Sequence, residues 1–230
     1  MRSRAAREEL PRGPIFERVA YRVAWHYGRL GAYRHPQALS AFEALEASDD
    51  AELRTWALVQ QAEGAVLRGQ VDRAEELLAA ADPAGAHTFA AEIALVRASI
   101  ARWRSELDRA AGLVTESASL PNGEAPQRAG VAVLEKSAVW AGLIAKDRGD
   151  LEAALREFEA VTSDDELIEA RVAFQKGDVL MALGRFDAAF GELERAVELA
   201  RENHALTHEQ SRYRSRRGTL HRRRGDLDLA

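Results

Sequence analysis

Three arginines near the C-terminal end of the 230-residue chain have a spacing that suits anion binding. Arg212, Arg216 and Arg223 recur at i, i+4 and i+11, so a helix would present them along one stripe. Each guanidinium can bind a carboxylate or a phosphate through two parallel hydrogen bonds, which favours an acidic peptide as the partner. The alternatives are a solvated arginine-rich helix face, a face covered by another segment, and a nucleic-acid site. We expect no nucleic acid, because no aromatic-interleaved basic platform accompanies the arginines.

Histidines close to these arginines have a spacing that metal sites use. His204 and His208 stand at i, i+4, as two zinc ligands on one helix would, with His221 further along. However, Thr207 to Gln210 has the pattern of a helix start, so the pair straddles a loop. We therefore predict no metal site.

Catalytic chemistry has little support in the chain. The pairs Asp49-Asp50 and Asp164-Asp165 stand where helices should begin, so we interpret them as caps rather than acid-base catalysts. The chain has no Cys, which excludes thiolate chemistry, and it lacks a phosphate-binding glycine loop, a serine nucleophile elbow and a zinc-protease helix. We predict no catalytic residue and no cofactor, and a protein that is not an enzyme.

The composition favours helices over sheets. Hydrophobic residues make up 47% of the chain and aromatic residues only 7%, whereas strands favour β-branched and aromatic side chains. No apolar run approaches a membrane span, and no secretory signal follows the N-terminal arginines, so we expect a cytoplasmic protein that does not bind membranes. The net charge is −5, yet residues 201–230 hold eight Arg against four acids. Three Lys against 29 Arg indicate a bacterial genome rich in GC.

A short motif repeats along the chain. Five six-residue segments align, with starts 36, 44, 35 and 41 residues apart. In each copy the third residue is apolar, the fourth is acidic and the sixth is Ala. The segments cover residues 69–74, 105–110, 149–154, 184–189 and 225–230.

Each column of the motif has a physical interpretation. A first-position Gly can adopt the left-handed conformation that ends a helix, and the acid belongs to the first turn of the next helix. The Ala allows two helices to approach closely. The motif therefore predicts helical hairpins. Ser105 replaces Gly in the second copy, so we expect a different or more strained turn there.

The repeat resembles the tetratricopeptide repeat. Gly177 lies seven residues before Gly184, as Gly142 does before Gly149, and apolar residues with Ala follow each turn. Residues 170–203 match best and 135–162 next, while copies starting near 52 and 91 have Ala where Gly is usual. The resemblance covers about three quarters of the chain. It implies an all-α, right-handed superhelix of about five hairpins and an incomplete last one.

The expected organisation is one repeat domain. Residues 1–13 form a flexible N-terminal segment and 14–230 the helical repeats. We expect three helices to begin with a capping box. The pairs are Asp49 with Glu52, Ser163 with Glu166, and Thr207 with Gln210. The expected hairpins are 14–47 (degenerate, with Pro36 starting its second helix), 51–82, 88–118, 129–162, 166–203 and 208–230 (incomplete), with a long loop over Ser117–Gln127.

The incomplete last hairpin raises two expectations. Its apolar face should lack a partner, which suggests that the chain is a fragment of a longer protein. The same face could join two copies, so the oligomeric state stays open.

The resemblance also implies a binding surface. In this family the first helices of the hairpins line a concave groove. The residues placed there include Phe174, Gln175, Met181 and Trp140, and the groove should be apolar in the middle and basic at its C-terminal end. Arg212 and Arg216 with Gln175 are similar to part of a carboxylate clamp, although Val139 and Leu143 stand where that clamp has Lys and Asn. Further positions on the groove are Lys136, Lys146, Asp147, Arg171, Asp178, Ala182, Ser215, Thr219 and Arg222.

Two functions are compatible with these features. The first is a non-catalytic scaffold that binds a protein or peptide, with Phe174, Met181 and Trp140 supplying burial and Arg212, Arg216 and Arg223 pairing with acidic groups. The alternative is the sensor or regulatory arm of a larger bacterial signalling protein, such as a kinase, transcription regulator or protease, whose effector domain is outside this chain.

Overall fold

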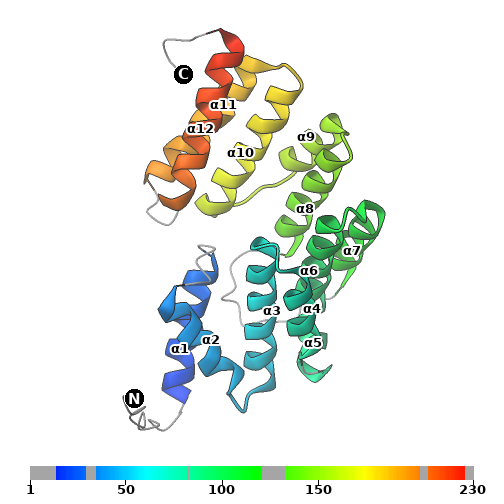
Figure 1. Ribbon diagram of the computed structural model, residues 1–230, viewed down its shortest axis with the longest axis vertical. Coiled ribbons are helices and arrows are strands. Elements are labelled where there is room, and N and C mark those ends of the chain that lie inside the picture. The colour runs from blue at the N-terminus through cyan, green and yellow to red at the C-terminus, as the bar shows by residue number, and fades with distance from the viewer. Residues whose placement is uncertain (1–13, 30–34, 82, 121–132, 203–206, 226–230) are drawn as a thin grey trace, which may run out of the picture. The chain divides into compact units, whose positions relative to one another are not determined.

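The computed structural model of the protein describes residues 14–29, 35–81, 83–120, 133–202 and 207–225. These residues form twelve helices and no strand (Figure 1), which confirms the all-α prediction. The chain divides into two compact units, residues 1–87 and 88–230, and each is described by itself.

The first unit is built on two hairpins. Helix α1 (Pro14–Arg29) packs on α2 (Pro36–Glu46), and α3 (Ala51–Leu67) packs on α4 (Val71–Ala79); the short α5 (Pro83–Thr88) lies at the boundary between the units. Trp56 is buried, with its ring centroid 4.6 Å from that of Tyr21 and 6.3 Å from that of Phe42. Pro36 occupies the first turn of α2, as expected, where its missing N–H leaves no hydrogen bond unmade.

The second unit holds the remaining helices. They are α6 (Ala90–Trp103), α7 (Leu107–Ser119), α8 (Val133–Asp147), α9 (Leu151–Glu159), α10 (Glu166–Ala182), α11 (Phe186–Glu202) and α12 (Thr207–Arg224). Each helix packs on the next in the chain, and first helices also pack on first helices, α6 on α8 and α10 on α12. Contacts between neighbours along the chain are the pattern of stacked hairpins rather than of a bundle around one axis.

The four described turns at residues 69, 105, 149 and 184 have the same backbone geometry. At Gly149, φ is 82°, its N–H donates to Lys146 O at 3.0 Å, and the next N–H donates to Ala145 O at 3.0 Å. Ser105 has φ 62° and makes the corresponding two bonds at 3.0 and 2.9 Å. It therefore forms the glycine-type turn, not a different one, in a conformation that L side chains disfavour. The prediction of strain is confirmed.

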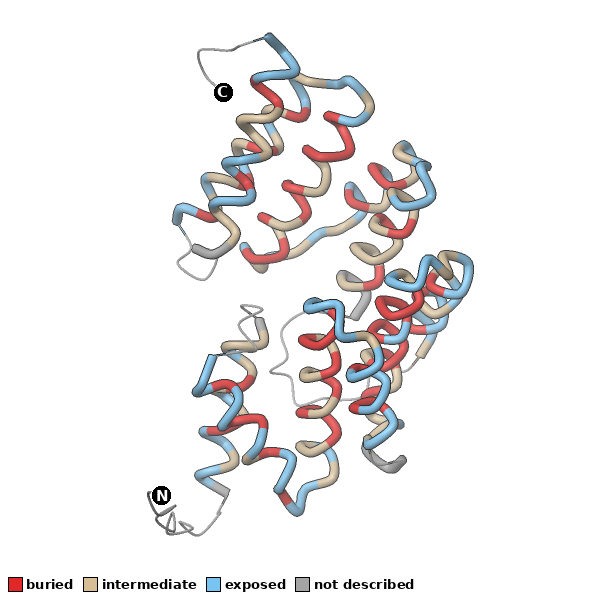
Figure 2. The backbone as a smooth tube through the Cα atoms, in the orientation of Figure 1, coloured by how far each residue is buried: buried red, intermediate tan, exposed pale blue. Residues whose placement is uncertain are grey.

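Small residues let the paired helices approach closely. The motif alanines Ala74, Ala110, Ala154 and Ala189 are all 0% exposed. A Cβ added at Gly142 would lie 2.6 Å from the Phe158 ring, and one at Gly177 would lie 2.7 Å from Leu193. Figure 2 shows these buried positions as red stretches along the helices. The small column thus sets the spacing within each hairpin.

The acidic column has a second role that the sequence did not indicate. It lies in the first turn of each second helix, as predicted. Three of these acids also pair with an arginine at the following hairpin turn. The pairs are Asp108 with Arg148 (2.5 Å), Glu152 with Arg185 (2.6 Å) and Asp187 with Arg224 (3.5 Å). Asp108 and Asp187 are fully or nearly fully exposed, so these pairs contribute little stability.

Two predicted caps are displaced by one or two residues. Asp50, not Asp49, caps α3, and its Oδ1 accepts from the N–H groups of Glu52 and Leu53. Asp165, not Ser163, caps α10, and Ser163 Oγ instead accepts the Asp165 N–H at 3.1 Å. A carboxylate on the residue directly before the helix reaches its free N–H groups. The interpretation of Asp50 and Asp165 as caps is confirmed.

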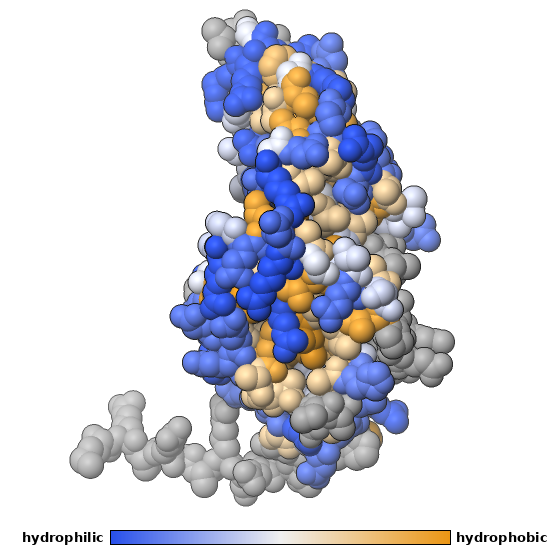
Figure 3. Space-filling model, turned by 90° about the vertical axis from the view of Figure 1, so that its right-hand side faces the viewer, coloured by the Kyte–Doolittle hydropathy of each residue, from blue (hydrophilic) through white to orange (hydrophobic). Residues whose placement is uncertain are grey.

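Two other expectations need correction. Ser117 belongs to α7, not to a loop; it is buried and its Oγ lies 3.0 Å from Ser137 Oγ on α8. Helix α12 has no apolar outer face among its described residues, because Tyr213, Leu220 and His221 are buried and arginines and serines cover the rest. Residues 121–127 and 226–230 lie outside the described part. Hydrophilic side chains also cover much of the face drawn in Figure 3, with hydrophobic ones between them.

Candidate functional site

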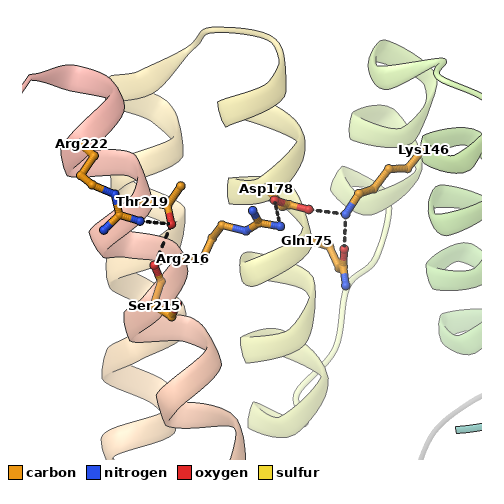
Figure 4. Close-up of polar contacts among 7 residues, drawn as sticks. All are labelled: Lys146, Gln175, Asp178, Ser215, Arg216, Thr219 and Arg222. Carbon is orange, nitrogen blue, oxygen red and sulfur yellow. Dashed lines mark hydrogen bonds and ion pairs between the residues drawn. The ribbon is translucent and has the colours of Figure 1, made fainter. Parts of the chain in front are cut away.

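An aspartate shared by two cations lies at the centre of the candidate site. Asp178 of α10 is buried, and its Oδ1 accepts from Arg216 Nη2 of α12 at 2.7 Å. Its Oδ2 accepts from Lys146 Nζ of α8, which also donates to Gln175 Oε1 at 3.1 Å. Figure 4 shows this row crossing three first helices. We call the side of α8, α10 and α12 that carries Trp140, Lys146, Gln175, Asp178, Arg212 and Arg216 the first-helix face.

The same arrangement occurs a second time on this face. Glu209 of α12 accepts from Arg171 of α10 at 3.0 Å and pairs with Arg212 at 3.5 Å. The Arg212 guanidinium also lies over the Phe174 ring, 4.4 Å from its centroid. The Glu209 side chain is 11% exposed, whereas Arg212 is 59% exposed. Again one covered carboxylate holds two more accessible cations.

Burial decides the ionisation of the tyrosine between these groups. Tyr213 is buried and stacks on Phe174 with ring centroids 4.8 Å apart. Burial raises the pKa of Tyr213 well above its usual value, and the negative charge of Glu209 raises it further. The ring therefore stays neutral and acts as a packing residue.

Helix α8 contributes apolar surface to the face. Trp140 is partly buried, and the Arg102 guanidinium of α6 lies 5.9 Å from its ring centroid. Arg102 also pairs with Asp147 at 2.5 Å. Val139 and Leu143 are partly buried against the core around α10, whereas Trp140 packs against the core around α6 and α7. All three side chains keep some accessible apolar area on α8, the helix that carries Lys146.

A family model of the tetratricopeptide repeat matches residues 170–203, which cover most of α10, the helix of Asp178, and all of α11. This hairpin is a repeat of the tetratricopeptide type within an all-helical chain. Repeats of this type are protein-interaction units. A search of curated proteins gave no match.

The structure brings together part of the predicted tetratricopeptide site. Arg212, Arg216 and Gln175 lie on the first-helix face, and Arg223 is exposed near the end of α12. Among the described contacts, Arg223 pairs with neither Asp178 nor Glu209. Its neighbour Arg222 donates to Thr219 Oγ1 at 3.0 Å.

Two predicted groove residues belong to the core instead. Phe174 and Met181 are each only 3% exposed. The resemblance to the repeat family placed them on the groove side, but α12 packs on α10 there, and Tyr213 and Arg212 cover Phe174. As the structure has them, neither side chain offers surface to a partner. Trp140 is the one of the three predicted apolar anchors that keeps accessible area.

Shared carboxylates are the feature that sequence reasoning missed. The repeat register places Lys146, Arg171 and Asp178 on the groove, yet it does not indicate that Lys146 pairs with Asp178 or that Arg171 pairs with Glu209. A search for acids and bases at groove positions of adjacent repeats could have found the Lys146, Asp178 and Arg216 row.

Other proposed chemistries find no support in the described residues. No group of three or more potential ligands there could hold a metal ion, and His204 and the His208 side chain lie outside the described part. In the same part, no helix is both long enough and apolar enough for a membrane span.

Proposed function

We propose that the chain is a non-catalytic scaffold that binds an acidic protein or peptide segment along its first-helix face. The observation that carries this proposal is a charge imbalance. Asp178 is shared by Lys146 and Arg216, and Glu209 is shared by Arg171 and Arg212. Four cations thus face two carboxylates, and the face keeps a positive charge that attracts acidic groups.

The cations are also held in place before a partner arrives. Arg216 is fixed by Asp178, and Arg212 is fixed by Glu209 and by the ring of Phe174. Fixed side chains lose less entropy on binding than free ones. A guanidinium has five N–H donors, so each arginine can keep its internal contact and still bind a carboxylate of the partner.

Apolar contacts would supply the remaining affinity. Val139, Trp140 and Leu143 belong to α8, the helix that carries Lys146, and are only partly buried. A tryptophan of this kind is a common energetic centre of an interface. The preferred partner therefore combines acidic side chains with an apolar one.

A peptide array tests the proposal. Peptides of about twelve residues with two acidic side chains and one apolar residue are compared with copies in which Lys replaces the acids. The double variant Arg212→Gln, Arg223→Gln should bind the acidic peptides about tenfold more weakly. Arg109→Gln, which changes an exposed arginine of α7, serves as the control. Equal binding of acidic and lysine peptides, or an unaffected double variant, would refute the proposal.

Arg216 is left intact in this test for a structural reason. Arg216→Gln would leave buried Asp178 with Lys146 as its one remaining counter-charge among the described contacts. Removing one partner of a buried ion pair destabilises the fold. Loss of binding by such a variant would not distinguish recognition from unfolding.

A further inference from the structure

A cavity of about 340 Å³ lies among α9, α10 and α11 of the second unit. Ile168, Val172 and Lys176 line it at intervals of four residues along α10, and parts of α9, α11 and the connection before α10 complete its wall. By helical periodicity Asp178 projects from the side of α10 opposite to Glu169, whereas Gln175 stands three residues from Val172 and borders the cavity side. No residue of the first-helix face lines the cavity, and the cavity volume is within the range of small-molecule sites.

The cavity has an apolar floor. Phe158 at the end of α9 and Ile168, Val172 and Ala173 of α10 line it, and all four are at most 8% exposed. These side chains belong to the core between the helices. They would contact the apolar part of a ligand.

The charged wall contains a carboxylate oxygen without a donor. Glu192 of α11 pairs with Lys176 through Oε1, and each side chain is 19% exposed. Its Oε2 is buried and accepts no hydrogen bond from the described residues. Leaving a buried acceptor unsatisfied is unfavourable, and a rotation of the Glu192 side chain that turns this oxygen toward the cavity lets a ligand N–H group supply the missing hydrogen bond.

The balance of charge around the cavity selects the sign of the ligand. Four carboxylates line it, from Glu159, Asp164, Glu169 and Glu192, against two cations, Lys176 and Arg195. Arg195 already pairs with Glu169, as Lys176 does with Glu192. The wall is therefore acidic by two charges.

We propose that this cavity binds a small organic cation, an ammonium or guanidinium group carried on an apolar body. The cationic group donates to Glu192 and to the neighbouring Glu169, and the apolar body lies on Phe158, Ile168 and Val172. An anion of the same shape meets the acidic wall and is rejected. The site does not depend on the peptide-binding proposal.

Hexylamine, protonated at pH 7, is the probe for the first experiment, and hexanoate is its control of equal shape and opposite charge. Methyl NMR signals of Ile168 and Val172 should shift with hexylamine until they saturate. Hexanoate should produce no saturable shift. If neither compound shifts these signals, or if hexanoate binds as tightly as hexylamine, the proposal is wrong.

Variants place the binding at Glu192. Glu192→Gln should weaken hexylamine binding about tenfold or more, since a hydrogen bond to a charged group is lost. Glu198→Gln, an exposed change on the same helix outside the cavity, should have no effect. Val172→Phe fills the cavity and leaves both ion pairs in place, so it provides a second test if Glu192→Gln perturbs folding.

The Arg212→Gln, Arg223→Gln variant should bind hexylamine as the unmodified protein does. This result separates the cavity from the first-helix face, so either proposal can fail alone. Unchanged hexylamine binding by both Glu192→Gln and Val172→Phe would overturn the assignment of the site.

Discussion

Asp178 illustrates how much one residue can determine in this molecule. It is buried between cations from two other helices, with Arg216 Nη2 at 2.7 Å and Lys146 on its other oxygen. The carboxylate joins α8, α10 and α12 and also sets the positions of the cations that would meet a partner. Its structural and functional roles therefore cannot be separated by deleting it.

Asp178→Asn should lower the free energy of unfolding by about 1 to 2 kcal/mol, since two partly covered cations lose their counter-charge. Urea denaturation measures the change. Asp108→Asn is the matched control, because the Asp108 side chain is fully exposed in its pair with Arg148, and it should shift the midpoint much less than Asp178→Asn does. Equal effects of the two changes would contradict this account of Asp178.

Ser105 offers a stabilising substitution. It has φ 62° in a turn where the other hairpins use Gly, so Ser105→Gly should raise stability by about 1 kcal/mol through relief of backbone strain. Thermal or urea unfolding tests this. The reverse change, Gly184→Ala, should be destabilising although no atom lies within 4 Å of the added Cβ, because φ there is 75°. A destabilising Ser105→Gly would show that its side chain has a role other than strain.

Tyr213 makes the fold sensitive to alkaline pH. Burial, assisted by the charge of Glu209, raises the pKa of Tyr213 above the ordinary value of 10.0. The unfolded chain then loses this proton at lower pH than the folded one, so stability present below pH 10 decreases as the pH rises further. Tyr213→Phe should reduce that decrease, as measured by urea unfolding between pH 9 and pH 11. The other tyrosines are present in both proteins, so their ionisation contributes equally to the two pH profiles.

At the scale of the elements, close packing of α10 on α11 depends on a missing side chain. A Cβ at Gly177 would lie 2.7 Å from Leu193 Cγ and 3.3 Å from Ala189 O. Gly177→Ala should therefore destabilise the protein by about 1 to 3 kcal/mol in denaturant unfolding.

Gly191 provides the control on the neighbouring helix. It is exposed on α11 and no atom lies within 4 Å of an added Cβ, so Gly191→Ala should be neutral or stabilising. A neutral Gly177→Ala would mean that the two helices separate readily, which would weaken the role assigned to the small column.

The elements themselves were largely predictable. The second helices α4, α7, α9 and α11 begin at the apolar third residue of each motif, because a left-handed turn residue and a first-turn acid are local signals. Caps were predicted less accurately. Both Asp49 and Asp50 have the right chemistry, and only the backbone path decides which side chain reaches the free N–H groups.

At the scale of the whole molecule, the two compact units should respond separately to damage. In a repeat protein each helix pair contacts mainly its neighbours, so destabilisation stays near its source. In Gly177→Ala, hydrogen exchange should accelerate in α10, α11 and α12, while the protection of α3 in residues 1–87 should not change. Equal acceleration in both units would indicate one cooperative core.

By itself, the sequence determined the all-α class, the hairpins and the buried alanines, because each follows from a few residues close together in the chain. The tertiary structure alone decided which groups remain available to a partner. Lys146 and Asp178 are 32 positions apart and Arg171 and Glu209 are 38 apart, so their pairing depends on how successive hairpins stack. Burial of Phe174 and the donor-free oxygen of Glu192 are likewise consequences of side chains that meet only after the helices have packed.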